Sequence, residues 1–270
     1  MAQFAPRTGT DHAFQLHLPE TAPPAAGFPL LWLLDAPTTW APMRHALEEA
    51  GCADAVAMIG IGWERPGRVD QGLRRRDFTR PARHEVPPPR GGGEWGHDGD
   101  SQAFLDLLAG VLQPAARAQL PIDPVRQVLA GHSLSGLFVL DTLLRKPDLF
   151  RHWYAASPSL WWDGKRIFDA LRKTEQRPPP GIRQAAAMLT VGSEEQRVGP
   201  ERPAGAGGKR EPVLLGEPHM VDNASAFAGR LAAAGVDCRF RLFEGEGHGG
   251  VLAPAMGAFV EHLHDALAPT

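Results

Sequence analysis

Residues 127–138 read QVLAGHSLSGLF, and this stretch decides the fold of the chain. An apolar run leads into Gly131-His-Ser133, and a helical pattern opens directly after it. The stretch is close to the G-x-S-x-G nucleophile elbow, in which a serine sits on a strained strand-to-helix turn between small residues. Ser135 stands where the motif has glycine, and its small size makes it tolerable there. The motif predicts Ser133 as a nucleophile; the alternative is a serine that only caps a helix.

Short apolar runs alternate with helical patterns on both sides of this turn, which is typical of a mostly parallel sheet covered by helices. Together with the elbow, this pattern predicts an α/β-hydrolase fold with helices on both faces of the sheet. No repeat or domain boundary is apparent, so the 270 residues are expected to form a single domain. The expected strands are 28–34, 53–61, 125–130, 153–156, 185–191 and 238–242. The expected helices run from Asp35 to Gly51, from Asp100 or Ser101 to Pro114, and over 134–145, 223–234 and 254–267.

Two segments interrupt the alternation. Residues 64–99 contain a basic stretch followed by a Pro- and Gly-rich run, and they are expected to form a long loop. Residues 197–218 are polar with several Pro and Gly, which predicts a mobile surface loop. Loops of such length in compact domains are usually functional or disordered.

The composition excludes several classes of protein. The chain is 43% hydrophobic and 22% charged, and 28 basic residues face 31 acidic ones, for a formal net charge of -3. Without a global basic field, a nucleic-acid partner is not expected. No apolar run suggests a signal peptide or a membrane span, so we expect a cytoplasmic protein, or a periplasmic one if a leader had been removed. Cys52 and Cys238 are expected to be buried without a disulfide, and no metal-ligand set or cofactor motif is visible.

A serine of ordinary pKa needs a base, and in this fold the catalytic residues follow the order Ser, acid, His. His248 lies between glycines in the loop after the last expected strand, and we predict it as the base. His262 and His264 fall on the terminal helix and are expected at the surface. His152 comes before the expected acid in the sequence, whereas the base should come after it, so His152 is not the expected base.

The acid should follow the strand that ends at Val191, where Gly192-Ser-Glu-Glu supplies two carboxylates. Side-chain alternation lets only one of them face the site, and we favour Glu195 over Glu194. Asp222 is a third candidate, and a Ser–His pair without an acid would also suffice. For the oxyanion, one backbone N–H is expected from Leu134. The other must come from Ala36 or Thr38, because the proline between them has no N–H.

Five segments come in one order along the chain: Leu33-Leu-Asp35, residues 74–79 (RRRDFT), the elbow, residues 157–162 (SPSLWW) and Gly247-His-Gly249. Together they resemble the esterase-D-like branch of α/β hydrolases, and within it the siderophore trilactone esterases, over residues 12–267. The resemblance implies an enzyme that opens the macrolactone of enterobactin, salmochelin or bacillibactin, with Ser133 as nucleophile and His248 as base. The chain departs from the family at Leu-Asp-Ala-Pro, where relatives have Leu-Asp-Gly and a residue other than Pro.

Eight Arg and four acidic residues lie between Glu64 and Arg90. They form either a solvated basic loop or a rim that recognises an anion, and guanidinium and indole groups suit a negatively charged catecholate complex. The resemblance singles out Arg76, because relatives carry Arg just before the Asp-aromatic-Thr segment. The indoles that could contact substrate are those of Trp63, Trp95, Trp161 and Trp162.

These observations predict a serine ester hydrolase without a resident metal or cofactor, and any iron would arrive inside the substrate. The preferred substrate is a catecholate siderophore trilactone, ferric or iron-free. The alternative is a general carboxylesterase for other small or aromatic acyl esters. The sequence also leaves open an acyl transferase and a binding protein on an inactive hydrolase scaffold.

Overall fold

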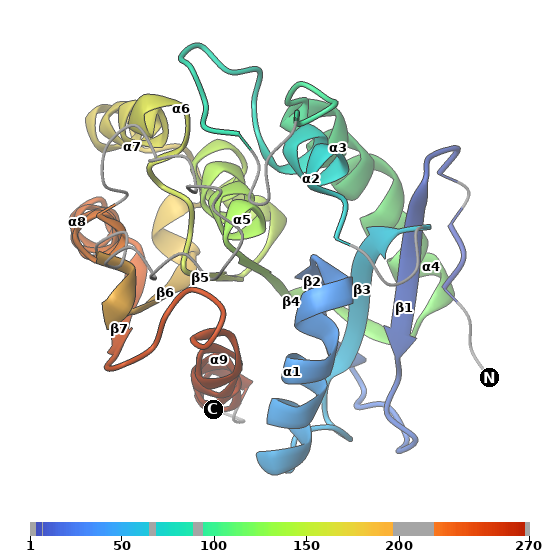
Figure 1. The fold of residues 1–270 in the computed structure, drawn as a ribbon. Coiled ribbons are helices and arrows are strands. Elements are labelled where there is room, and N and C mark those ends of the chain that lie inside the picture. The colour runs from blue at the N-terminus through green and yellow to red at the C-terminus, as the bar shows by residue number, and fades with distance from the viewer. Residues whose placement is uncertain (1–3, 7, 65–68, 89–93, 197–218, 268–270) are drawn as a thin grey trace, which may run out of the picture.

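The computed structural model describes residues 4–6, 8–64, 69–88, 94–196 and 219–267. A seven-stranded sheet in the order β1-β3-β2-β4-β5-β6-β7 forms its centre (Figure 1). Only the β1–β3 pair is antiparallel, and every other neighbouring pair is parallel. The strands are β1 (His12–His17), β2 (Phe28–Leu34), β3 (Ala57–Trp63), β4 (Ile122–His132), β5 (His152–Ala156), β6 (Ala186–Gly192) and β7 (Asp237–Phe243). The predicted α/β-hydrolase fold is confirmed.

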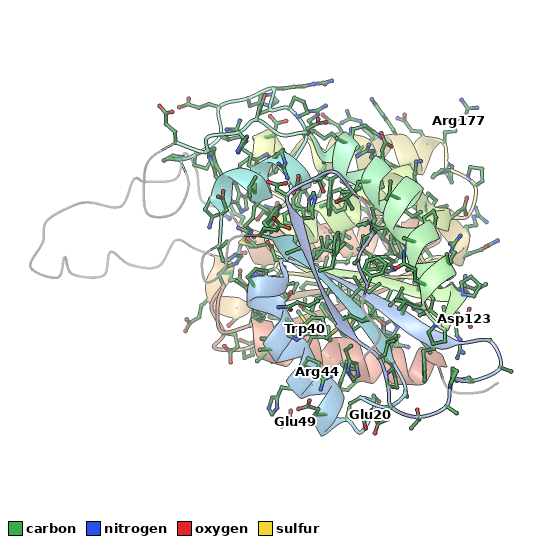
Figure 2. All side chains as sticks on the ribbon, turned by 90° about the vertical axis from the view of Figure 1, so that its right-hand side faces the viewer. Glu20, Trp40, Arg44, Glu49, Asp123 and Arg177 are labelled. Atoms are coloured by element: carbon green, nitrogen blue, oxygen red, sulfur yellow. The ribbon has the colours of Figure 1, made fainter. Side chains whose placement is uncertain are left out.

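Helices cover both faces of the sheet, as predicted (Figure 1). The fully buried strand β2 shows why, since Trp32 belongs to one apolar core and Leu33 to the other. The first core is completed by α3 (Ser101–Leu107), α4 (Gln113–Gln119), α5 (Leu134–Arg145), α7 (Ile167–Gln176) and α8 (Met220–Ala233). The second is completed by α1 (Ala36–Glu49) and α9 (Leu252–Leu267). The polar side of α1 carries Arg44 and Glu49 at the molecular surface (Figure 2).

The sequence predicted that the helix starting at Ser101 ends at Pro114, but the helix continues beyond this residue. It continues to Gln119 through a π-helical turn over Leu108–Leu112, where the N–H of Gln113 donates to the carbonyl of Leu108. Pro114 then lies at the start of α4, directly after the widened turn. A π turn shifts the hydrogen-bond pairing, so a proline can follow it without breaking the helix.

Several elements were not predicted: β1, α7, the short helix α6 (Trp162–Lys165) and α2 (Gln71–Phe78). Helix α2 corrects the expectation of a loop throughout 64–99, and the side chain of Asp70 caps it by accepting from the N–H of Leu73 at 3.0 Å. Residues 65–68 and 89–93 of that segment lie outside the described residues. The expected mobile loop 197–218 also lies outside them.

The terminal helix places a histidine differently from the prediction. His262 is buried rather than exposed, and its ring packs against those of His152 and Tyr154. Cys52 is buried and Cys238 half-buried, both as thiols. None of the helices in the described ranges is long and apolar enough to cross a membrane.

Candidate active site

Ser133 occupies a strained turn between β4 and α5. Its backbone has φ 63° and ψ −118°, a conformation that L-residues rarely adopt. The N–H of Ser133 donates to the carbonyl of Ala156 at 3.0 Å, which fixes the turn to the end of β5. A Cβ on Gly131 would lie 2.7 Å from the carbonyl carbon of Ser135, so the close approach of strand and helix requires glycine there. The turn therefore has the geometry of a nucleophile elbow.

Two side chains from neighbouring strand ends extend a chain of hydrogen bonds from this serine. His248, in the loop after β7, places Nε2 at 2.9 Å from the hydroxyl oxygen of Ser133. Its Nδ1 lies 2.5 Å from Oε2 of Glu195, which belongs to a short helical turn after β6. The carboxyl ends of β4, β6 and β7 thus bring Ser133, Glu195 and His248 into contact.

Glu195 is buried and fully hydrogen-bonded. Its Oε1 accepts from the hydroxyl of Ser157 at 2.6 Å and from the N–H of Gly192 at 2.8 Å. Burial opposes ionisation, but the hydrogen bonds from His248, Ser157 and Gly192 outweigh it and lower the pKa of Glu195. The carboxylate is therefore charged at neutral pH and can orient the imidazole.

The other two carboxylates considered from the sequence lie elsewhere. Glu194 is exposed, and its N–H donates to the carbonyl of Glu246. Asp222 is exposed on α8 and is hydrogen-bonded to Gln196. Of the three candidates, Glu195 is the one that contacts His248.

His132 is a site residue that the sequence reasoning missed. Its Nε2 lies 2.9 Å from the carbonyl oxygen of His248, so this nitrogen carries the proton and donates. Desolvation and the nearby charge of His248 lower the pKa of His132 to about 3, so its ring is neutral over the ordinary pH range. His132 thus holds the backbone of His248 in place. The sequence feature that could have identified it as a site residue is its position next to Ser133 in the elbow.

Ser135 does more than fit the space of a glycine. Its hydroxyl donates to Oδ2 of Asp35 at 2.8 Å and accepts from the N–H of His132 at 2.9 Å. Asp35 is buried in the left-handed conformation, with φ 57°, and receives two 2.9 Å hydrogen bonds from the guanidinium of Arg74. This network joins the loop after β2 to the elbow.

The backbone donors considered for the oxyanion begin two helices. Leu134 is the first residue of α5, and Ala36 is the first residue of α1. The first N–H groups of a helix have no acceptor within it and are free to bind an anion. The N–H of Thr38, the alternative to Ala36, donates to the carbonyl of Asp35 at 2.9 Å. The turn at Asp35 therefore uses Thr38 and leaves Ala36 as the better-suited donor.

Four arginines of the arginine-rich segment are ion-paired in the part of the chain that the structure describes. Arg76 binds Asp77 at 2.7 Å and Asp11 at 2.9 Å, so its guanidinium is already neutralised by two carboxylates. Three neighbours are paired in the same way: Arg74 with Asp35, Arg75 with Asp98 and Arg80 with Asp141. A substrate role for Arg76 stays a prediction that its observed contacts do not favour.

The four candidate tryptophans separate into two groups. Trp63 is buried at the end of β3 and donates to Oδ2 of Asp77 at 2.7 Å, so it is part of the core. Trp162 is also buried, 4% exposed, and its contact with substrate stays a prediction. Half-buried Trp95 and Trp161 pack against it, with ring centroids 5.2 and 5.8 Å away. Contact with substrate stays a prediction for these two.

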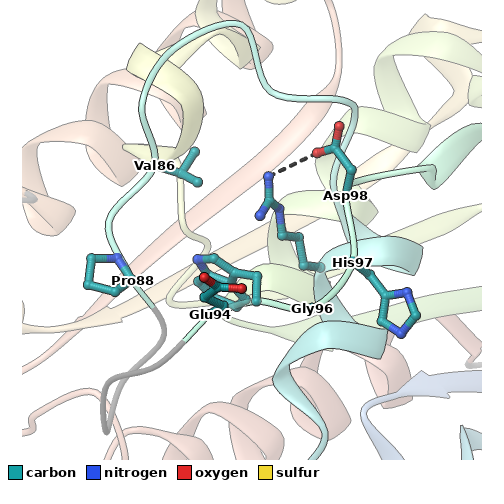
Figure 3. Close-up of a pocket in the computed structure, with 8 residues that line it drawn as sticks. Val86, Pro88, Glu94, Gly96, His97 and Asp98 are labelled. Atoms are coloured by element: carbon teal, nitrogen blue, oxygen red, sulfur yellow. Dashed lines mark hydrogen bonds and ion pairs between the residues drawn. The ribbon is translucent and has the colours of Figure 1, made fainter.

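An open surface pocket of about 470 Å³ lies beside Trp95. Figure 3 shows its wall, in which Arg75 is hydrogen-bonded to Asp98. The other lining residues are Val86, Pro88, Glu94, Gly96 and His97.

Across the described ranges, no group of three or more His, Cys, Asp or Glu could hold a metal ion.

A serine on a strained elbow, hydrogen-bonded through a histidine to a buried carboxylate, defines a serine hydrolase of the α/β-hydrolase fold. Residues 5–248 match the model of an esterase family described as "Putative esterase". The chain belongs to this family and is a carboxylic-ester hydrolase.

Named relatives agree with this assignment. The chain is 34% identical to the ferri-bacillibactin esterase BesA of Bacillus subtilis, over 90% of this chain and 81% of the relative. It is 30% identical to a siderophore enterobactin esterase of Emericella nidulans, over 83% of this chain and 75% of the relative. The fold is similar to that of the BES protein from Bacillus cereus, with a TM-score of 0.75 and 22% identity over 97% of this chain and 94% of that one.

Proposed function

We propose that this esterase hydrolyses the ester bonds of a catecholate siderophore trilactone through an acyl-enzyme on Ser133. The observation that carries the mechanism is the continuous hydrogen-bonded chain from Ser133 through His248 to Glu195. The substrate class is supported by the names of the relatives, two of which are a ferri-bacillibactin esterase and an enterobactin esterase.

The reaction proceeds in two halves. The hydroxyl oxygen of Ser133 attacks an ester carbonyl while Nε2 of His248 takes the hydroxyl proton. Glu195 stabilises the imidazolium that forms, and His248 then protonates the departing alkoxide. A water activated by His248 hydrolyses the acyl-enzyme, which regenerates Ser133.

The negative charge on the attacked carbonyl oxygen needs donors that are in place beforehand. In this proposal the N–H groups of Leu134 and Ala36 supply them. They open α5 and α1, whose N-terminal ends also favour negative charge. The left-handed turn at Asp35, held by Arg74 and Ser135, sets the position of Ala36 relative to the elbow.

The proposal is tested by comparing wild type with Ser133→Ala on a chromogenic acyl ester and on ferric and iron-free enterobactin and bacillibactin. We expect wild type to release linear hydroxyacid products from a trilactone, separated by chromatography, and the variant to release none. Equal activity of the two proteins would refute the mechanism. Hydrolysis of simple esters without cleavage of either trilactone would refute the substrate and leave a general carboxylesterase.

A further inference from the structure

The turn Ser157-Pro158-Ser159 lies against both ends of the hydrogen-bonded chain in the site. It follows β5 directly, and both serines are buried. The N–H of Ser157 donates to the carbonyl of Thr190 on β6 at 2.8 Å, and the N–H of Ser159 donates to the carbonyl of Ser133 at 3.1 Å. Ser157 has φ 41°, an unusual value for a residue other than glycine. The backbone of this turn is therefore fixed between β6 and the elbow.

The two hydroxyls of the turn contact Ser133 and Glu195, the two ends of the hydrogen-bonded series in the site. The hydroxyl of Ser157 lies 2.6 Å from Oε1 of Glu195. The hydroxyl of Ser159 lies 3.3 Å from the hydroxyl oxygen of Ser133. With His248 between Ser133 and Glu195, the side chains form a ring that the tripeptide closes.

The direction of each hydrogen bond follows from the available protons. An ionised carboxylate only accepts, so Ser157 donates to Glu195. Ser133 has one hydroxyl proton, and the nucleophile must direct it at Nε2 of His248 for that proton to be taken. The contact between the two hydroxyls therefore has Ser159 as donor and the nucleophilic oxygen of Ser133 as acceptor.

We propose that Ser159 is a further catalytic residue, which donates a hydrogen bond to the reacting oxygen of Ser133, and that Ser157 is a positioning residue for Glu195. The proposal rests on the esterase mechanism above. During attack the Ser133 proton moves to His248 while the bond from oxygen to carbon forms, and Ser159 keeps its own proton throughout. Its hydrogen bond stabilises the partial negative charge that the Ser133 oxygen carries where proton transfer runs ahead of O–C bond formation, and again as the O–C bond breaks during deacylation.

Ser159→Ala tests the catalytic part. The readout is the rate at which a fluorophosphonate labels Ser133, a single step that needs no deacylation, together with kcat and KM on a chromogenic ester. Losing one hydrogen bond between neutral groups should slow labelling and kcat about two- to tenfold, with little change in KM. The matched control is Ser101→Ala, because Ser101 is a buried serine at the start of α3 whose hydroxyl has no hydrogen-bond partner among the described residues. Labelling of Ser159→Ala at the rate of wild type and this control would overturn the catalytic role.

Ser157→Ala tests the positioning part through the pH profile of kcat/KM. Removing a donor from the buried Glu195 makes the Glu195–His248 pair bind a proton more readily, so the acidic limb should move to higher pH by about one unit. Ser157→Gly is the second variant, since glycine accepts the positive φ and also lacks the hydroxyl. Acidic limbs at the wild-type pH in both folded variants would overturn this role.

These experiments use simple probes, so their outcome is independent of whether a trilactone is the substrate. A wild-type protein that reacts with neither the fluorophosphonate nor the ester would overturn the proposed mechanism and this inference together. Normal wild-type reactivity with unchanged serine variants would overturn the inference alone.

Discussion

At the scale of the residue, adjacent glutamates have opposite environments. Glu195 is buried against His248, whereas Glu194 is exposed. The same substitution at each of the two glutamates therefore tests the role of Glu195, because the two residues are identical in type and adjacent in the sequence.

We predict that Glu195→Gln lowers kcat by about 10²- to 10⁴-fold, because an amide cannot stabilise the imidazolium and favours the wrong tautomer of His248. Glu194→Gln should retain the activity of wild type. Steady-state hydrolysis of a chromogenic ester measures both. Similar losses in the two variants would contradict the assignment of Glu195.

The sequence could place the nucleophile and the base more firmly than the acid, and the structure shows the reason. Ser133 and His248 each lie in a glycine-containing turn that directly follows a strand recognisable in the sequence. Glu195 follows β6 in a short helical turn, where alternation no longer decides which side chain faces the site. Only the fold shows that Ser157, on another strand end, hydrogen-bonds to Glu195 and not to Glu194.

At the scale of the element, the buried ion pair between Arg74 of α2 and Asp35 holds two elements beside the elbow. We predict that Arg74→Leu lowers the free energy of unfolding by about 3–5 kcal/mol, because it leaves the carboxylate of Asp35 buried and unpaired. The matched control is Arg172→Leu, whose ion pair with Asp169 is about 60% exposed on both sides. This change should cost less than about 1 kcal/mol. Urea denaturation measures both, and equal costs would contradict the role of Arg74.

Helix α2 was not predicted from the sequence because ion-paired charged residues lie on its buried face. Its buried face includes Arg74 and Asp77 as well as Leu73 and Phe78, so charged residues occupy positions where a helical pattern would show apolar ones. The partners that make this burial acceptable are distant in the chain, and no local pattern announces them. The strands were easier to predict, since β2 and β6 are nearly continuous apolar runs buried on both faces.

At the scale of the whole molecule, stability should fall in mild acid because of a histidine in the core between the sheet and α9. Burial, together with the charges of His262 and Arg151, lowers the pKa of His152 to about 4. In the unfolded chain an imidazole has its ordinary pKa of about 6.5 and takes up the proton first. The contribution of His152 to stability is therefore complete above that ordinary pKa and is lost as the pH falls towards the folded value.

We predict that between pH 7 and pH 5 this residue alone removes about 2 kcal/mol from the free energy of unfolding. His152→Leu should lose correspondingly less over the same interval, whatever its stability at pH 7. Chemical denaturation at the two pH values measures the difference. An unchanged pH dependence in the variant would contradict the prediction.

The arginine-rich segment shows which charge interactions a sequence alone leaves undetermined. The cluster of arginines between 64 and 90 predicted either a solvated basic loop or a rim that recognises an anion, and Arg74, Arg75, Arg76 and Arg80 each bind a carboxylate. Three of these arginines have partners far along the chain: Asp11, Asp35 and Asp141. Long-range pairing of this kind is a property of the fold and is invisible in a count of charges.

The position of β7 bears on how copies of the protein meet in a crowded solution. In the described part of the chain, β7 pairs with β6 on one side and with no strand on the other. An open strand edge is a template for joining a second molecule, and charged side chains along it discourage that joining. Arg239 and Arg241 alternate along β7 with the partly exposed Phe240, and Arg241 is paired with Glu261 of α9 at 2.8 Å. Charged side chains along this border therefore disfavour its pairing with the edge strand of a second molecule.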